Sequence, residues 1–170
     1  MKKFVISFII VIIIVCLNSD KIVIPKESIR IRVIPNSNTV YDQNVKNEVK
    51  KEIEKNLSKI VGNPKSIEEA RININNNIDY INDSVSKKIS SFDEKIDFDV
   101  NYGMNYFPKK IYNGVIYDEG MYESLVITLG SGKGDNWWCV LFPPFCLIEA
   151  TESEDVVYKF KVKEIIEKYF

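Results

Sequence analysis

The side chains that could carry out chemistry gather in the second half of the sequence, between residues 118 and 146. Cys139 would act as a nucleophile only with an unusual base such as Lys133, because the chain contains no histidine. Asp118 and Glu123 could form the paired carboxylates of a glycan hydrolase, but acids beside a turn and a strand end are usually solvated surface groups. We therefore predict that the chain has no catalytic residue and is not an enzyme.

Composition narrows the possible functions further. The absence of histidine rules out Ser-His-Asp and Cys-His catalysis and any His-ligated zinc or haem site, and we expect neither a metal nor another cofactor. The 23 basic residues are balanced by 24 acidic residues. Without the N-terminal Lys2 and Lys3, 21 basic residues stand against 24 acidic ones, so no basic field favours nucleic acid as a partner.

The segment 130–146 has a composition unlike the rest of the chain, and it reads GSGKGDNWWCVLFPPFC. A Walker motif requires Ser or Thr after the lysine, whereas Gly134 follows Lys133, so we expect a loop that needs positive φ angles and not a nucleotide site. The adjacent Trp137 and Trp138 should point to opposite sides of an extended segment. Two interpretations stay open: one tryptophan is an exposed interface anchor, or both rings belong to the core beside an irregular loop.

The two cysteines of this segment could be bridged. Cys139 and Cys146 lie seven residues apart on either side of Pro143-Pro144, and outside the cytoplasm such a pair can form a persistent disulfide. Closing so short a loop would stabilise the fold by about 2–3 kcal/mol. The alternative is a pair of buried, reduced thiols.

The first residues are typical of an export signal. Lys2 and Lys3 precede an almost unbroken apolar run over residues 4–17. As a helix this run would span about 21 Å, which is short for a hydrocarbon core of about 30 Å and favours a signal peptide over a stable anchor. The match to a cleavage site is loose, so residues 4–17 could also remain as a membrane tether, and Cys16 allows a lipoprotein interpretation.

Hydrophobic periodicity predicts an α+β domain with a small antiparallel or mixed sheet that a helical hairpin covers on one face. Residues 29–34 alternate apolar and basic side chains as a strand does, before a turn that begins at Pro35. Two amphipathic helices follow, one with its cap near Asp42 and one that begins at the capping box Ser66-x-x-Glu69. The expected core stripes are Val45, Val49, Ile53, Leu57 and Ile60 in the first helix, and Ile67, Ala70, Ile74, Ile78, Ile81, Val85 and Ile89 in the second.

The remaining elements are strands and a terminal helix. Residues 96–102 alternate with period two, 125–129 form an apolar run, and 115–117 could add a short hairpin strand after the Asn113-Gly114 turn. Residues 156–169 are typical of a C-terminal helix. The expected organisation is 1–19 signal peptide or anchor, 20–28 linker, 29–150 folded domain and 151–170 helical extension.

The sequence NWWCV over residues 136–140, followed by Phe142-Pro143-Pro144 and Cys146, resembles the signature of the stage II sporulation protein R family. The resemblance extends in the same order over roughly residues 29–148. The other residues on which the resemblance is based are Gly120, Tyr122, Glu123, Leu125, Phe107-Pro108, Tyr112, Arg32-Val33-Ile34, Asn36-Ser37 and Asp42-Gln43.

The resemblance implies a protein that is made in the forespore, secreted across its membrane and active in the intermembrane space. Its implied role is to activate a membrane-embedded aspartic protease of the mother cell, which then processes pro-sigma-E during sporulation. We expect the partner-binding residues to be Gly134, Asn136, Trp137, Trp138, Phe142, Pro143 and Pro144, together with Asn36, Ser37, Asp42 and Gln43. The competing hypotheses are an envelope-binding protein, which would use the same aromatic residues, and a cell-wall hydrolase that uses Cys139 or Glu123.

Overall fold

The computed structural model describes residues 22–92, 95–112, 115–146 and 155–170. The predicted export signal and the Asn113-Gly114 turn lie outside these residues. None of the helices in the described ranges combines the length and apolar character needed to cross a bilayer.

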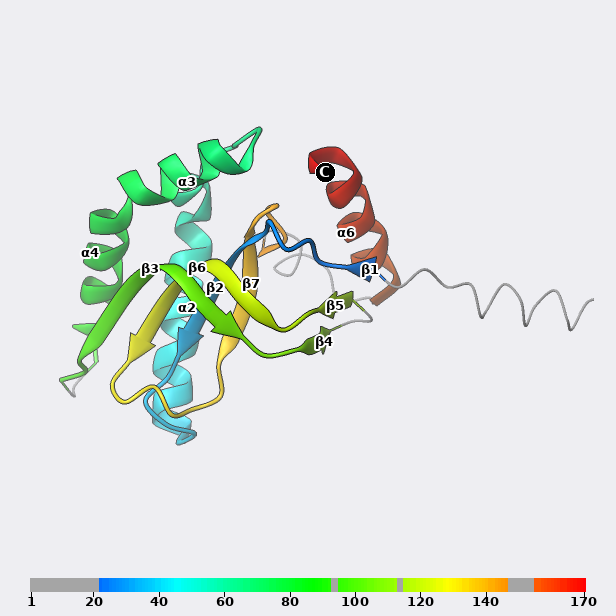
Figure 1. The fold of residues 1–170 in the computed structure, drawn as a ribbon. Coiled ribbons are helices and arrows are strands. Elements are labelled where there is room, and N and C mark those ends of the chain that lie inside the picture. Colours follow the sequence, from blue (N-terminus) through cyan, green and yellow to red (C-terminus); the bar gives the residue numbers. More distant parts are fainter. Residues whose placement is uncertain (1–21, 93–94, 113–114, 147–154) are drawn as a thin grey trace, which may run out of the picture.

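A four-stranded sheet forms the centre of the fold (Figure 1), and its strand order is β3-β6-β2-β7. The strands are β2 (Ile29–Ile34), β3 (Phe98–Phe107), β6 (Gly120–Leu129) and β7 (Trp137–Phe142). Strand β2 pairs parallel with β6 and antiparallel with β7, and β3 pairs antiparallel with β6. The sheet is therefore mixed, and β3 and β7 are its edges.

Three helices cover one face of this sheet. They are α2 (Val40–Ile60), α3 (Ile67–Asn76) and α4 (Ile78–Ile89). The predicted stripes are confirmed, since their central members Val49, Ile53, Ile74 and Ile81 are fully buried. These helices pack on the apolar side chains of β2 and β6 to form the main core, which confirms the α+β class.

Two details of the helices differ from the sequence expectation. Thr39, and not Asp42, is the N-cap of α2, because its Oγ1 accepts from the amide of Asp42 at 3.1 Å and places Asp42 in the first turn. The second helix is interrupted at Asn77, whose side-chain amide donates to the carbonyl of Asn73 at 2.8 Å. Side chains of this kind compete with the helical backbone for hydrogen bonds. The Ser66 cap is confirmed by its 3.2 Å bond from the Glu69 amide.

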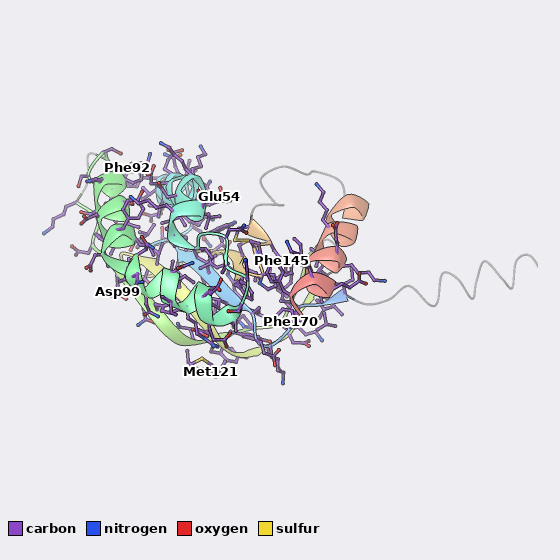
Figure 2. The ribbon with its side chains drawn as sticks, turned by 90° about the horizontal axis from the view of Figure 1, so that it is seen from above. Glu54, Phe92, Asp99, Met121, Phe145 and Phe170 are labelled. Carbon is purple, nitrogen blue, oxygen red and sulfur yellow. A yellow bond between two sulfur atoms is a disulfide. The ribbon has the colours of Figure 1, made fainter. Side chains whose placement is uncertain are left out.

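A smaller second layer lies beside the free edge of β7. Its three strands, in the order β1-β5-β4, are β1 (Ile22–Val23), β4 (Lys110–Tyr112) and β5 (Val115–Tyr117). The helix α6 (Asp155–Tyr169) closes this side. Figure 2 shows Phe145 between the body of the domain and α6, and Phe145 is fully buried in a second apolar cluster with Val162 of α6 and Val140 of β7.

The helix-facing core makes a testable prediction about stability. Replacing Ile53, which is fully buried, by Ala should lower the free energy of unfolding by about 2–4 kcal/mol, because it leaves a cavity between α2 and the sheet. The matched change Ile72→Ala, at a position on α3 that is 58% exposed, should cost less than about 1 kcal/mol. Urea denaturation measures both, and equal losses would contradict the assignment of the core.

Candidate functional site

Two segments far apart in the sequence form one hydrogen-bonded unit at an end of the sheet. The first segment, residues 35–43, consists of the turn before α2 and the first residues of that helix. The second segment, residues 130–136, is the loop that joins β6 to β7. Backbone bonds run from the Lys133 amide to the carbonyl of Asn36 at 3.1 Å and from the Gly134 amide to the carbonyl of Pro35 at 3.0 Å. We call these two segments the turn–loop junction. It brings four of the residues predicted to bind a partner, Asn36, Ser37, Asp42 and Gln43, together with two others, Gly134 and Asn136.

Side chains fix the turn–loop junction from within. Asn36 Oδ1 accepts from the Ser131 amide at 2.9 Å, and Asn38 Oδ1 accepts from the Asp135 amide at 2.6 Å. Lys46, which is buried on α2, donates to the carbonyl of Asp135 at 3.1 Å. The junction is therefore a rigid, polar surface whose shape is set before any partner binds.

Asp42 is the acidic centre of the turn. Its Oδ2 accepts from the Ser37 hydroxyl and, at 3.1 Å, from Asn36 Nδ2. The Ser37 bond, followed by the bonds from Asn36 and Thr39, lowers the pKa of the Asp42 carboxyl below its ordinary value of 3.8. Gln43 donates from Nε2 to the Ser37 carbonyl at 3.2 Å. Asp42 and Gln43 thus hold the turn in place, and their own polar side-chain atoms are largely used in these hydrogen bonds.

Two glycines explain why the loop is rich in this residue. Gly130 and Gly132 have φ angles of 55° and 64°, which confirms the expectation of positive φ. Gly134 has a different role, since a Cβ at this position would collide with the backbone of Ser37. The close approach of the two backbones therefore requires a residue without a side chain.

Of the two interpretations of the Trp-Trp segment, the extended one holds, since Trp137–Phe142 form strand β7. Trp137 and Trp138 are both half-buried and lie on opposite faces of the sheet, as their adjacency in an extended segment predicts. Trp137 packs against the core on the helix side, with Lys50 Nζ 5.2 Å from its ring centroid. Trp138 meets the ring of Phe107 edge-on at 5.3 Å on the other side. Each tryptophan has one surface in contact with the protein and one available to a partner.

Beyond the tryptophans, the predicted residues turn inward. Cys139 and Cys146 form a disulfide, with Cα atoms 5.6 Å apart, and both are buried. Phe142 is 2% exposed and packs edge-on against Tyr169 of α6 at 5.1 Å between ring centroids. Pro143 is buried and Pro144 is half-buried. These residues hold the end of β7 against the second layer and present little surface.

The groups considered for catalysis do not converge. Glu123 lies on the helix side of the sheet, where its carboxylate accepts from Arg71 Nε at 2.8 Å and from Tyr102 at 2.6 Å. Burial, together with the bond to Glu123, raises the pKa of the Tyr102 phenol. Asp118 instead pairs with Lys109 at 3.9 Å. Cys139 is tied up in the disulfide, and within the described ranges no group of three acidic or cysteine side chains is placed to hold a metal ion.

Sequence reasoning missed the two arginines of β2, which it treated as the polar side of an alternating strand. Arg30 is 1% exposed, and its guanidinium carbon lies 3.3 Å from the centroid of the Tyr122 ring. Arg32 stacks on Phe107 at 5.0 Å. Burial lowers the pKa of both guanidinium groups. The feature that could have indicated their burial was arginine at alternate positions of a strand that lies between two others.

A cavity of about 200 Å3 opens beside these arginines, around β7. It brings together three of the predicted partner-binding residues, Asn136, Trp137 and Trp138, with Arg30. Its full lining is Arg30, Lys50, Phe107, Lys110, Tyr117, Asn136, Trp137, Trp138 and Cys139. Asn136 belongs to both sites, because it lines the cavity and is the last residue of the loop in the turn–loop junction.

Fold and site together define a class: a small, disulfide-closed α+β domain with a rigid polar junction and an aromatic, basic cavity. Within that class, a family model described as "Stage II sporulation protein R" matches residues 25–152, and the chain belongs to this family. The resemblance drawn from the Trp-Trp segment is confirmed.

A curated relative supports the same assignment. The chain is 36% identical over 138 residues to "Stage II sporulation protein R" of Bacillus subtilis (strain 168), an alignment that covers 81% of this chain and 62% of the relative. The chain thus aligns with less than two thirds of the relative's length. No solved structure matches the chain. Family and relative place the protein in sporulation.

The Asp42 network predicts a pH dependence of stability. Because the folded-state pKa of Asp42 lies below 3.8, its stabilisation is complete above that pH and is lost as the pH falls through the folded pKa. Asp42→Asn should lower the free energy of unfolding by about 1 kcal/mol at pH 7, and the difference from wild type should shrink toward pH 3. Urea denaturation across this range tests it. The exposed control Asp83→Asn should change stability by less than about 0.5 kcal/mol at pH 7.

The disulfide predicts a redox dependence. Replacing both Cys139 and Cys146 by Ser should lower the free energy of unfolding by about 2–3 kcal/mol, because the unfolded chain regains the entropy that the closed loop removes. Adding reductant to the wild type should produce a similar loss and should leave the double variant unchanged. Wild-type stability that does not respond to reductant would contradict the bridge.

Proposed function

We propose that this protein is an exported signalling protein of the forespore that activates a membrane-embedded aspartic protease of the mother cell, which then processes pro-sigma-E. The observation that carries the proposal is the family match over residues 25–152, which includes the turn–loop junction, both tryptophans and the disulfide. Because the alignment covers 62% of the curated relative, the activity, location and partner of the whole protein all belong to the proposal.

The proposed mode of action is that of a rigid ligand and not of a catalyst. The junction is held by bonds such as those from the Ser131 and Asp135 amides, so binding would cost little ordering of the backbone. A preformed surface can shift a receptor toward its active state only through contacts that differ between the receptor's two states. The half-buried rings of Trp137 and Trp138 supply the large, rigid contact area typical of such anchors.

The proposed location is the intermembrane space. The apolar residues 4–17 after Lys2 and Lys3 are typical of an export signal. The disulfide between Cys139 and Cys146 supports an environment outside the cytoplasm, since such bonds are rare where thiols are kept reduced. If the signal stays uncleaved, residues 4–17 would tether the domain to the membrane.

The proposal is tested by reconstitution in a heterologous cell that carries the cognate protease and pro-sigma-E. Processing should occur when this protein is exported and should be absent without it. Trp137→Ala combined with Trp138→Ala should reduce processing at least about tenfold, because two anchors of the contact are lost. The control is Tyr106→Ala, which removes an aromatic ring that is 55% exposed on the opposite edge strand β3 and should leave processing unchanged.

The folded state of each variant is checked by its thermal unfolding transition and by the amount exported. Processing that needs no exported protein would contradict the signalling role. If the Trp double variant is folded and exported and retains full processing, the proposed docking surface is wrong, but the signalling role is unaffected. If Glu123→Gln abolished processing while the fold remained intact, the hydrolase hypothesis would replace the ligand model.

A further inference from the structure

Arg30 is a buried charge without a carboxylate partner. It is 1% exposed, and among the described residues no acidic side chain forms an ion pair with Arg30 or with Arg32. Its guanidinium donates from Nη1 to the main-chain carbonyl of Asp118 at 3.5 Å, whereas Nε and Nη2 have no hydrogen-bond partner within the described ranges. Buried charges are normally paired, because leaving one unpaired costs several kcal/mol.

The unpaired donors have the geometry of a bidentate anion site. Nε and Nη2 lie on the same edge of a planar guanidinium, and this fork matches the two oxygens of a carboxylate. Arg32 adds a further buried Nε without a partner. The aromatic rings of Tyr122 and Phe107 hold the guanidinium groups by stacking and offer no negative charge to neutralise them.

The cavity that Arg30 lines is basic and aromatic. Lys50 and Lys110 also line it, and no Asp or Glu is among its lining residues. Lys110 Nζ lies 5.3 Å from the centroid of the Trp138 ring, so its charge is held at the cavity wall. The carboxylate of Glu54 lies 3.4 Å from Lys50 and therefore neutralises only part of the positive charge around the cavity. A volume of about 200 Å3 suits a single side chain better than a drug-sized ligand.

The position of the cavity indicates how a ligand would approach. Strand β7 pairs only with β2 within the described sheet, and its residues from Cys139 onward are buried. The open part of this edge is its start, where Trp137 and Trp138 line the cavity from the two faces of the strand. A free strand edge accepts an extended peptide through main-chain hydrogen bonds, with alternate side chains entering pockets. Asn136 Oδ1, a buried acceptor without a partner, adds a receiving group for a peptide amide.

We propose that this cavity binds the carboxylate of an acidic side chain on an extended segment of a partner protein, with Arg30 as the bidentate anchor and Lys110 in support. The aromatic walls match the methylenes of a Glu or Asp side chain better than a fully hydrated inorganic anion. The inference rests on the proposed function only in taking a protein as the source of the carboxylate.

The experiment uses intrinsic tryptophan fluorescence, because the chain has two tryptophans and both line the cavity. The full chain is titrated with a short blocked peptide of alternating threonine and valine that carries one central glutamate. The same peptide with glutamine, sodium acetate and inorganic phosphate are the other probes. The glutamate peptide should bind at least about tenfold more tightly than each of them, because glutamine lacks the charge and the small anions lack the main-chain contacts of the peptide.

Variants then locate the site. Arg30→Gln should abolish the preference for glutamate over glutamine, and Lys110→Gln should weaken binding of the glutamate peptide about threefold. Lys109→Gln is the matched control, since Lys109 is adjacent in sequence, exposed and outside the cavity lining. If Arg30→Gln does not fold, Lys110→Gln still decides the question, because Lys110 lines the cavity and is exposed.

Three results would overturn the inference: no saturable binding of the glutamate peptide, equal affinity for glutamate and glutamine peptides, or phosphate binding as tight as the glutamate peptide. Equal effects of Lys110→Gln and Lys109→Gln would also overturn it. These outcomes are separate from a failure of the proposed function. Peptide binding does not require pro-sigma-E processing, and processing that persists in a folded Arg30→Gln variant would contradict the cavity as a receptor contact while leaving the signalling role intact.

Discussion

The pairing of β2 with both β6 and β7 is the constraint on which the rest of the structure depends. It joins residues 29–34 to strands that begin at Gly120 and Trp137, in parallel register with the first and antiparallel register with the second. A parallel pair cannot be closed by a tight turn, so the chain between the two strands must cross over. Here the crossing contains α2, α3, α4, β3, β4 and β5. The helices therefore cover one face because the connection requires it.

The same pairing creates the turn–loop junction. Because β2 ends where the β6–β7 loop turns back, the turn after Ile34 and the loop at 130–136 must lie side by side. Their polar backbones are then close enough to satisfy each other, as the bonds between Lys133 and Asn36 and between Gly134 and Pro35 show. A side chain at Gly134 would prevent this approach. The conformation of the junction thus follows from strand register, and Asp42 and Asn38 stabilise it further.

The two faces of the sheet carry different kinds of interaction. On the helix side, apolar residues of β2 and β6 pack into the main core beneath the helices. On the other side, the arginines of β2 are stacked among rings such as Tyr122 and Phe107 and retain unused hydrogen-bond donors. Stability thus comes chiefly from the first face, and the proposed carboxylate site uses groups of the second. The disulfide links the end of β7 to the corner that α6 covers.

The sequence by itself determined the local elements and the family. Apolar spacing located both helical stripes, the Ser66 capping box marked the second helix, and the alternation over 29–34 placed β2, because these signals depend on neighbours within a few residues. It also singled out the residues of both halves of the junction and the bridged cysteines. Those residues were identified by their type and by resemblance, so their shared location did not follow from spacing.

Tertiary structure alone decided the rest. That Trp137–Phe142 is an edge strand, that Arg30 is buried, and that a basic cavity surrounds β7 all result from contacts between segments far apart in sequence. An alternating strand has the same pattern whether its polar face meets water or a layer of aromatic rings. The placement of Phe107 and Tyr122 over β2 makes Arg30 a buried charge and not a surface one. Burial depends on which distant side chains cover a residue and not on the residue's own neighbours in the chain.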